Sequence, residues 1–387
     1  MRDLTILLGA GFSRNCGFPL ANDINEKFSN LDPENLLFFL SGEWKWDEHS
    51  EADSNNGRLA YDRLGLSLLL HSYIEKYITE CEKSFDYEEF LDWFIENSSN
   101  VDLLQDKINE VNSKIKETYD LPENDASYLA SSQERVYKNH LYDCYNELIA
   151  DLLSRDYEIR YNQMDYFGFL VFFQMFKNKY IFTLNHDLLL EYLLKRYNKE
   201  YSDGFSLDNS PITGEKDEPL EVFSNQYVND TKLYKLHGSI DYYRFDFYNQ
   251  SKALYLRTGE YLFFKPKSYH NKHFAKRIDL DSGKVIQNQN INITPQFLTG
   301  KNKPMVIENS RFYGYLFNSF ADVLKQTSDL LIIGYSFGDT HINEMIIKTI
   351  DSRVIKNVYN INRSDTDFFK IHGFKGNYFY YDNISNF

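Results

Sequence analysis

The chain has 387 residues, of which 42% are hydrophobic and 26% charged, as is typical of a globular protein with one large domain and insertions or with two domains. Its net charge of −15 argues against broad nucleic-acid binding, and no apolar run approaches the roughly 18 residues that a membrane helix needs. The three cysteines (Cys16, Cys81 and Cys144) are dispersed, which argues against a disulfide framework and a four-cysteine zinc site, so we expect a cytoplasmic protein that binds no metal ion.

The first predicted element is a buried strand at residues 5–8 that runs into a tight glycine turn. Gly9 and Gly11 let the backbone turn sharply and approach a ligand without a Cβ in the way. A helix after the turn would direct its free N–H groups to the same place, which suits a diphosphate. However, Arg14 stands where the dinucleotide fingerprint has its third glycine, and no acidic residue ends a second strand about 20 residues on. A tight turn that binds nothing is therefore an equal alternative.

Helical periodicity without strand alternation extends over residues 59–176, which predicts a helical insertion in an α/β domain. One helix start is clear, because Asp86 can cap it and Phe85 with Phe90 can form a hydrophobic staple. Further helices are expected over residues 101–118 and 136–153, and an exposed loop over residues 42–57.

Residues 241–264 are aromatic and alternating, with turn signals at Asn249-Gln250 and Thr258-Gly259, which predicts a small β-hairpin. Short apolar runs predict further strands at residues 180–183, 232–236, 330–333, 354–361 and 378–381. Because helical connections separate most of these runs, they favour a parallel sheet with helices on both faces.

Polar or glycine-rich residues follow four of these strands, at residues 9–13, 183–187, 236–241 and 333–339. Carboxyl ends of parallel strands meet at one edge of an open sheet, where ligands bind. We therefore expect these four segments to line one crevice. Capping is the alternative reading of three residues: Asn185 and Asp187 could cap a helix that begins at Leu188, and Asp339 could cap the helix that follows it.

Two histidines follow these strands. His237 ends a buried strand before Gly-Ser and has little packing reason to be polar, and its ordinary pKa near 6.5 suits proton transfer. A histidine hydrogen-bonded to the backbone would look the same, so that alternative stays open. We interpret His186 as a structural residue.

Several of these segments resemble, in motif and order, the sirtuin family. They are Gly9-Ala10-Gly11-Phe12-Ser13 with Gly17-Phe18-Pro19, then Thr183-Leu184-Asn185-His186-Asp187, then Leu236-His237-Gly238-Ser239. Gly334-Tyr335-Ser336 resembles its later glycine-serine turn, and Tyr359-Asn360-Ile361-Asn362 the strand end that contacts the adenine ribose. The resemblance implies a Rossmann-like α/β fold that binds NAD, formed by residues 1–29, 166–240 and 300–387. Residues 30–165 would then be an inserted helical subdomain and residues 241–299 an aromatic hairpin insertion.

The chain departs from sirtuin deacylases in two places. It lacks the two cysteine pairs that hold their zinc, and Pro19-Leu20-Ala21-Asn22 stands where the family has Pro-Asp-Phe-Arg. It resembles instead the zinc-free sirtuin-like NADases of bacterial anti-phage defence, most of all the type that assembles with a HerA-like ATPase. The resemblance implies a homo-oligomeric NAD hydrolase that releases nicotinamide and ADP-ribose. A deacylase that lacks zinc and a non-catalytic NAD or ADP-ribose sensor are the alternatives.

The resemblance also implies residue roles, with NAD as the substrate. Asn185 would position the ribose and the attacking water, Asp187 would bind the nicotinamide carboxamide, and His237 would be the general base. Arg14 would pair with a phosphate or form a surface salt bridge. The remaining contacts fall on the phosphates, from Gly9, Ala10, Gly11, Phe12 and Ser13, and on the adenosine half, from Gly334, Ser336 and Asn362.

Overall fold

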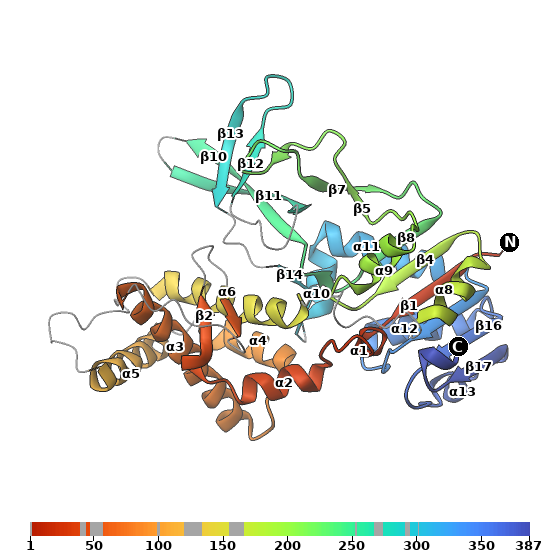
Figure 1. Cartoon of the computed structure of the whole chain (residues 1–387), viewed down its shortest axis with the longest axis horizontal. Helices are drawn as coiled ribbons and strands as arrows, with labels where there is room; N and C mark the ends of the chain where they lie inside the picture. Colours follow the sequence, from red (N-terminus) through yellow and green to blue (C-terminus); the bar gives the residue numbers. More distant parts are fainter. Residues whose placement is uncertain are drawn as a thin grey trace.

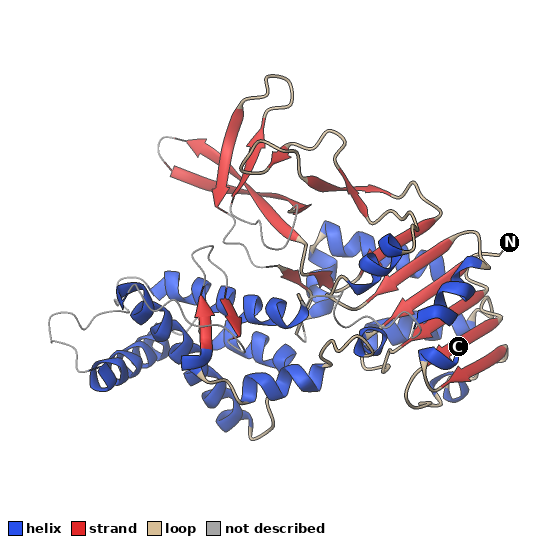
Figure 2. Cartoon of the chain, viewed as in Figure 1, coloured by secondary structure: helices blue, strands red, loops and turns tan. Residues whose placement is uncertain are grey.

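The computed structural model describes residues 2–38, 44–46, 57–98, 101–119, 134–154, 166–251, 254–266, 274–290, 295–300 and 302–387 (Figure 1). Three parts are distinct in Figure 2: a sheet covered by helices, which carries both termini, a helical subdomain, and an antiparallel β module. Within the described ranges, no helix is both long and apolar enough to cross a membrane.

All strands of the central sheet are parallel, and their order is β17-β16-β15-β1-β4-β8. The order reverses between β1 and β15, which is the strand order of Rossmann folds. The predicted α/β class with a Rossmann-like sheet is confirmed. The strands are β1 (Leu4–Leu8), β4 (Lys179–Thr183), β8 (Thr231–Lys235), β15 (Asp329–Ile333), β16 (Asn357–Ile361) and β17 (Asn377–Tyr381).

The predicted strand at residues 354–361 begins three residues late, at Asn357. The chain turns at Arg353, which has a φ of 58°, and Ile355 lies in the loop that follows, with its side chain buried in the core. The apolar character that suggested a longer strand therefore comes from packing rather than from pairing.

Helices cover the two faces of the sheet according to the alternation of its side chains. Leu4, Ile6 and Leu8 of β1 share a buried cluster with α8 (Phe167–Gln174) and α9 (Leu189–Arg196). Leu7 points to the other face and shares a cluster with α11 (Arg311–Leu324) and α12 (Thr340–Asp351). The remaining short helices here are α1 (Ala10–Arg14), α2 (Ala21–Ser29), α10 (Lys303–Asn309), α13 (Phe368–Ile371) and η5 (Ile384–Asn386).

In its described residues, the helical subdomain has four α-helices and a two-stranded sheet. Its described elements are η1 (Pro33–Asn35), β2 (Leu36–Phe38), β3 (Trp44–Trp46), α3 (Gly57–Cys81), α4 (Tyr87–Asn97), α5 (Val101–Tyr119) and α6 (Glu134–Leu153). The predicted helices over residues 101–118 and 136–153 are confirmed. The predicted exposed loop is wrong at residues 44–46, because Trp44 is buried and β3 pairs with β2. Residues 42–43 and 47–56 lie outside the described residues.

The start of α4 has the predicted geometry. Asp86 Oδ1 accepts from the amides of Glu88 and Glu89 at 3.1 and 2.9 Å. The rings of Phe85 and Phe90 pack with centroids 5.1 Å apart, as a hydrophobic staple requires.

Replacing Asp86 with alanine removes this cap and leaves two amides without an acceptor. We expect Asp86→Ala to lower the free energy of unfolding by about 1 kcal/mol, as typical N-cap removals do. Urea unfolding followed by circular dichroism measures it. Asp86→Asn keeps the acceptor and should lose little, so an equal loss in both variants would contradict a capping role.

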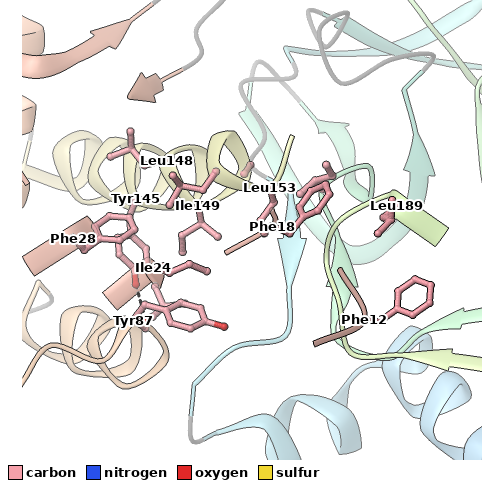
Figure 3. Close-up of a cluster of buried hydrophobic side chains, with 14 of the residues drawn as sticks. Phe12, Phe18, Ile24, Phe28, Tyr87, Tyr145, Leu148, Ile149, Leu153 and Leu189 are labelled. Atoms are coloured by element: carbon pink, nitrogen blue, oxygen red, sulfur yellow. Dashed lines mark hydrogen bonds between the residues drawn. The ribbon is translucent and has the colours of Figure 1, made fainter. Parts of the chain in front are cut away.

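One hydrophobic core joins the helical subdomain to the sheet. It runs from Phe12 and Leu189, beside the sheet, through Phe18, Ile24 and Leu153 into the helical subdomain, where it reaches Tyr145 and Phe28 (Figure 3). The two parts therefore pack as one continuous unit, which places the first turn of α4 near the edge of the sheet.

The β module is larger than the predicted hairpin. β10 (Tyr243–Ser251) and β11 (Leu254–Lys265) do pair in antiparallel fashion, but Asn249 and Gln250 lie within β10 rather than in a turn. Gly259, at a φ of 83°, marks a register shift in β11. The other strands are β5 (Gly204–Ser206), β6 (Ile212–Thr213), β7 (Glu221–Gln226), β9 (Gly238–Ser239), β12 (Phe274–Ile278), β13 (Val285–Asn290) and β14 (Gln296–Phe297). Four of them, β5, β6, β7 and β9, come from the range 166–240 that the sequence places in the Rossmann-like part.

Candidate active site

A cavity of about 890 Å³ lies at the carboxyl edge of the sheet, across the point where the strand order reverses. Its size is within the range of about 300–1,000 Å³ that small-molecule sites occupy. The helical subdomain supplies part of the wall through Tyr87, Glu88 and Leu153. All but one of the predicted site residues line it: Gly9, Ala10, Gly11, Ser13, Asn185, Asp187, His237, Gly334, Ser336 and Asn362.

The glycines at this edge pack against one another. The Gly9 amide donates to Ile333 O at 2.9 Å and the Gly11 amide to Gly334 O at 3.0 Å. A Cβ on Gly9 would lie 2.5 Å from Gly334 O, and one on Gly334, whose φ is +66°, would lie 2.3 Å from Phe12 N. Glycine is therefore required because two strand-end turns cross without room for a side chain, a reason that the sequence alone does not reveal.

Phe12 is the predicted site residue that lies away from the cavity. Its ring packs edge-on against Tyr166 and Phe169, with centroids 5.1 and 5.6 Å apart. Its amide donates to Gly9 O at 2.9 Å, and its carbonyl accepts from the Tyr166 hydroxyl at 2.6 Å. Phe12 thus anchors α1 in the core.

Asn185 ties the loop after β4 to the first turn. Its Nδ2 donates to Gly9 O at 3.0 Å and to Ser13 Oγ at 3.1 Å. Both amide hydrogens are committed, so the amide oxygen is the atom left to accept from a ligand. Asn185 does not cap α9, which settles one alternative left by the sequence.

Asp187 has a structural role at the start of α9, where Oδ1 accepts from the Leu189 amide at 2.9 Å. Burial raises the pKa of its carboxyl, while Lys235, the Leu189 amide and a hydrogen bond from Ser13 act in the opposite direction. Lys235 is itself buried and donates to Asp187 O at 2.5 Å and to Glu191 Oε1 at 2.9 Å. The carboxylate is therefore held in place while it still lines the cavity.

His237 is 4% exposed, and its Nε2 has no hydrogen-bond partner among the described residues. The alternative of an imidazole bonded to the backbone through this nitrogen does not hold. Burial, the Lys303 ammonium and two other histidines lower the pKa of His237 well below its ordinary value. The ring is therefore neutral at pH 7, with a nitrogen able to accept a proton.

His186, interpreted from the sequence as structural, is buried and also lines the cavity. Its Nδ1 lies 3.4 Å from Gly238 O, and its ring centroid lies 6.3 Å from that of His237. Burial, followed by the charges of Lys303 and Lys235, lowers the pKa of His186 to about 3. It adds a second neutral imidazole to this side of the cavity.

The far side of the cavity is formed by the loops after β15, β16 and β17. Gly334, Ser336 and Asn362 lie here, and the Asn362 side chain donates to Asn360 Oδ1 at 2.5 Å.

Arg14, at the end of α1, forms the salt bridge that the sequence left as an alternative. Its Nη1 pairs with Asp23 Oδ2 at 2.5 Å, and both side chains are exposed. Arg14 also lines the cavity.

Residues 179–366 match the family model of the SIR2-like domain. No curated protein is found to match the chain. The SIR2-like region begins at β4 and ends beyond β16, so it holds Asn185, His237 and Asn362 but not the first glycine turn or the helical subdomain. The match supports a place in the sirtuin-like superfamily, whose domains bind NAD, and is compatible with NAD-utilising activity.

The sequence analysis missed a charged cluster beside the cavity, of which Glu88 and Asp339 line the wall. Lys303, at the start of α10 within the SIR2-like region, is buried, and its Nζ lies 2.7 Å from Glu88 Oε2 and 3.2 Å from Asp339 Oδ1. Asp339 stands at the N-cap position of α12, but its side chain makes no capping hydrogen bond. The capping alternative for its carboxylate is therefore wrong. His341, two residues further, is the signal that the sequence offers: a histidine in the first turn of a helix that follows a strand end.

Proposed function

We propose that the chain is an NAD glycohydrolase, which cleaves the nicotinamide–ribose bond to give nicotinamide and ADP-ribose. The observation that carries this proposal is the free Nε2 of buried, neutral His237 in a cavity that Asn185 also lines, at the strand reversal of a SIR2-like sheet. A dinucleotide in this crevice would span it from the loop after β4 to the loop after β16.

NAD binding is expected to use fewer backbone amides of the first glycine turn than the sequence suggests. The amides of Gly9, Gly11 and Phe12 donate to backbone carbonyls, so the Ala10 amide, at the first position of α1, remains for a phosphate. Asn362 and Ser336, on the far side, suit the adenosine half. Asp187, beside Asn185, suits the nicotinamide carboxamide, whose NH₂ can donate to a carboxylate.

The reaction adds one water across the glycosidic bond. As in other glycoside cleavages, the C1′–N bond breaks through an oxocarbenium-like state, and its electron pair leaves with neutral nicotinamide. The water oxygen forms the new bond to C1′, and His237 Nε2 takes the released proton. The amide oxygen of Asn185 accepts a hydrogen bond from the ribose or the water. A weakly basic imidazole suffices here because water attacks a cation.

Lys303 should set the pH range of this step. We expect Lys303→Met to raise the pKa of His237, because the substitution removes the largest nearby positive charge. The imidazole must be neutral to accept a proton, so the acid limb of kcat/KM for nicotinamide release should move to higher pH. A pH–rate profile measures it, with Lys325→Met, at the exposed C-cap of α11, as the control. An unmoved acid limb would contradict the assigned base.

One experiment separates this proposal from the two alternatives. The purified chain is incubated with NAD, with and without an acylated peptide, and nicotinamide is followed by chromatography. Release without peptide supports the hydrolase, and release only with peptide supports a deacylase that lacks zinc. Binding without any release supports a sensing module.

The biological setting belongs to the proposal as well. Resemblance supports a role in anti-phage defence through NAD depletion, as a homo-oligomer with a HerA-like ATPase as partner. Because Glu88 of the helical subdomain reaches the site through Lys303, a partner bound to this subdomain could alter the cavity. Phage challenge of cells that carry wild-type or His237→Gln protein, with intracellular NAD measured, tests this role.

A further inference from the structure

Two histidines and one aspartate gather beside the cavity from separate strand ends. His237 follows β8, whereas Asp339 and His341 come from the loop after β15 and the first turn of α12. One potential ligand atom of each residue lies within 4.8 Å of those of the other two. The ring centroids of His237 and His341 are 6.0 Å apart.

Each of the two imidazoles has one nitrogen without a hydrogen-bond partner among the described residues. This nitrogen is Nε2 in both His237 and His341, and both atoms are buried. A buried polar atom without a partner destabilises the fold unless a ligand satisfies it. The fold therefore keeps two nitrogens that could coordinate a metal ion close together, with a carboxylate beside them.

We propose that His237, His341 and Asp339 form a binding site for a divalent transition-metal ion of the zinc class. Two imidazoles and one carboxylate are a ligand set that zinc takes in catalytic centres, where a fourth position stays open for water or a small ligand. Magnesium and calcium prefer oxygen ligands, so a site with two nitrogens selects against them. The sequence predicts no such site, because His237 is about a hundred residues from Asp339 and His341 and no spacing motif joins them.

The positive charge of Lys303 repels a bound cation and so lowers the affinity of the site for metal ions. Its ammonium engages Asp339 Oδ1 and Glu88 Oε2, which leaves the second oxygen of the Asp339 carboxylate for a metal. The two carboxylates outnumber the one ammonium, so the local charge still favours a cation. Affinity should therefore be moderate and should increase when Lys303 is neutralised.

Metal binding and NAD cleavage should exclude each other. A metal ion on His237 Nε2 occupies the lone pair that accepts the proton, and it fills space at the cavity wall that His237 and Asp339 line. This consequence rests on the proposed function, whereas metal binding itself does not.

The test uses the full, tag-free chain after removal of metals, titrated with Co²⁺ as a spectroscopic probe and with Zn²⁺ by calorimetry. We expect one ion per chain with visible Co²⁺ absorption of low coordination number. His341→Gln and Asp339→Asn should each weaken binding at least about 100-fold, more than loss of a supporting residue does. Lys303→Gln should tighten it about tenfold. His71→Gln, which removes a histidine paired with Glu75 on α3, is the matched control and should change nothing.

Absence of the absorption, or binding that persists in both His341→Gln and Asp339→Asn, would overturn the site. Thermal unfolding of each variant confirms that it is folded. In the activity arm, Zn²⁺ should inhibit nicotinamide release by the wild type, and the ratio of rates with and without Zn²⁺ should approach one in His341→Gln. Activation by Zn²⁺ would overturn mutual exclusion. If the chain cleaves no NAD at all, the Co²⁺ spectrum still decides the metal site, so the two proposals fail separately.

Discussion

Replacing His237 with glutamine is expected to lower kcat for nicotinamide release by about 10²–10⁴-fold, the usual contribution of a general base. Glutamine is polar and of similar size, so it can still hydrogen-bond a water in the cavity, but it cannot take up the water's proton. Chromatographic measurement of nicotinamide over time gives the rate. Because the imidazole nitrogen has no partner among the described residues, its loss should leave the stability of the fold nearly unchanged.

The control is His372→Gln, which changes a histidine that packs against Phe368 at the end of α13. Its rate should equal that of the wild type. NAD binding by His237→Gln, followed by calorimetry, should persist, because the glycine turns and Asn362 are untouched. A rate within threefold of the wild type in His237→Gln would exclude this residue as the base.

The site could be predicted from the sequence wherever its residues are local to a strand end. Buried apolar runs mark β4, β8 and β15, and the polar residues that follow each run are forced to the same edge by the parallel arrangement. For this reason the sequence places Asn185, His237 and Ser336 at one edge of the sheet, and all three line the cavity there. The helix start at Asp86 was predictable for the same reason, since a cap and a staple involve only six neighbouring residues.

What could not be predicted depends on contacts between distant segments. Glu88 and Lys303 meet only because the helical subdomain shares a core with the sheet. The hydrophobic periodicity of the sequence does not predict which residues of the two parts come into contact. The β module was underestimated because β6 and β7 pair with β12 and β11, which lie far along the chain, and β5 in turn pairs with β7. Asp339 could be recognised as a strand-end carboxylate, but the choice between cap and ion pair depends on the position of Lys303.

The second large expected effect is a loss of stability when a glycine of the crossing turns is replaced. Gly334→Ala should lower the free energy of unfolding by about 2–5 kcal/mol, through a left-handed backbone and an overpacked contact together. The φ of Gly334 is +66°, and an added Cβ would lie 2.3 Å from Phe12 N and 2.4 Å from the Gly11 backbone. Neither neighbour is a flexible side chain, so the β1 and β15 turns would have to separate. Urea unfolding measures the loss, and calorimetry with NAD should show weaker binding.

Two other glycines separate the backbone strain from the crowding. Gly373 has a φ of +70°, but its added Cβ meets no described atom within 4 Å, so Gly373→Ala should lose only about 1–2 kcal/mol. Gly338 lacks a positive φ, and its Cβ would meet Ser336 Oγ at an ordinary 3.5 Å, so Gly338→Ala should stay within about 0.5 kcal/mol of the wild type. If Gly334→Ala loses no more than Gly373→Ala, the turns are not in the close contact described, and the cavity would not depend on their crossing. A larger loss, with weakened NAD binding, means that the same crossing of two strand ends holds the fold together and shapes the ligand site.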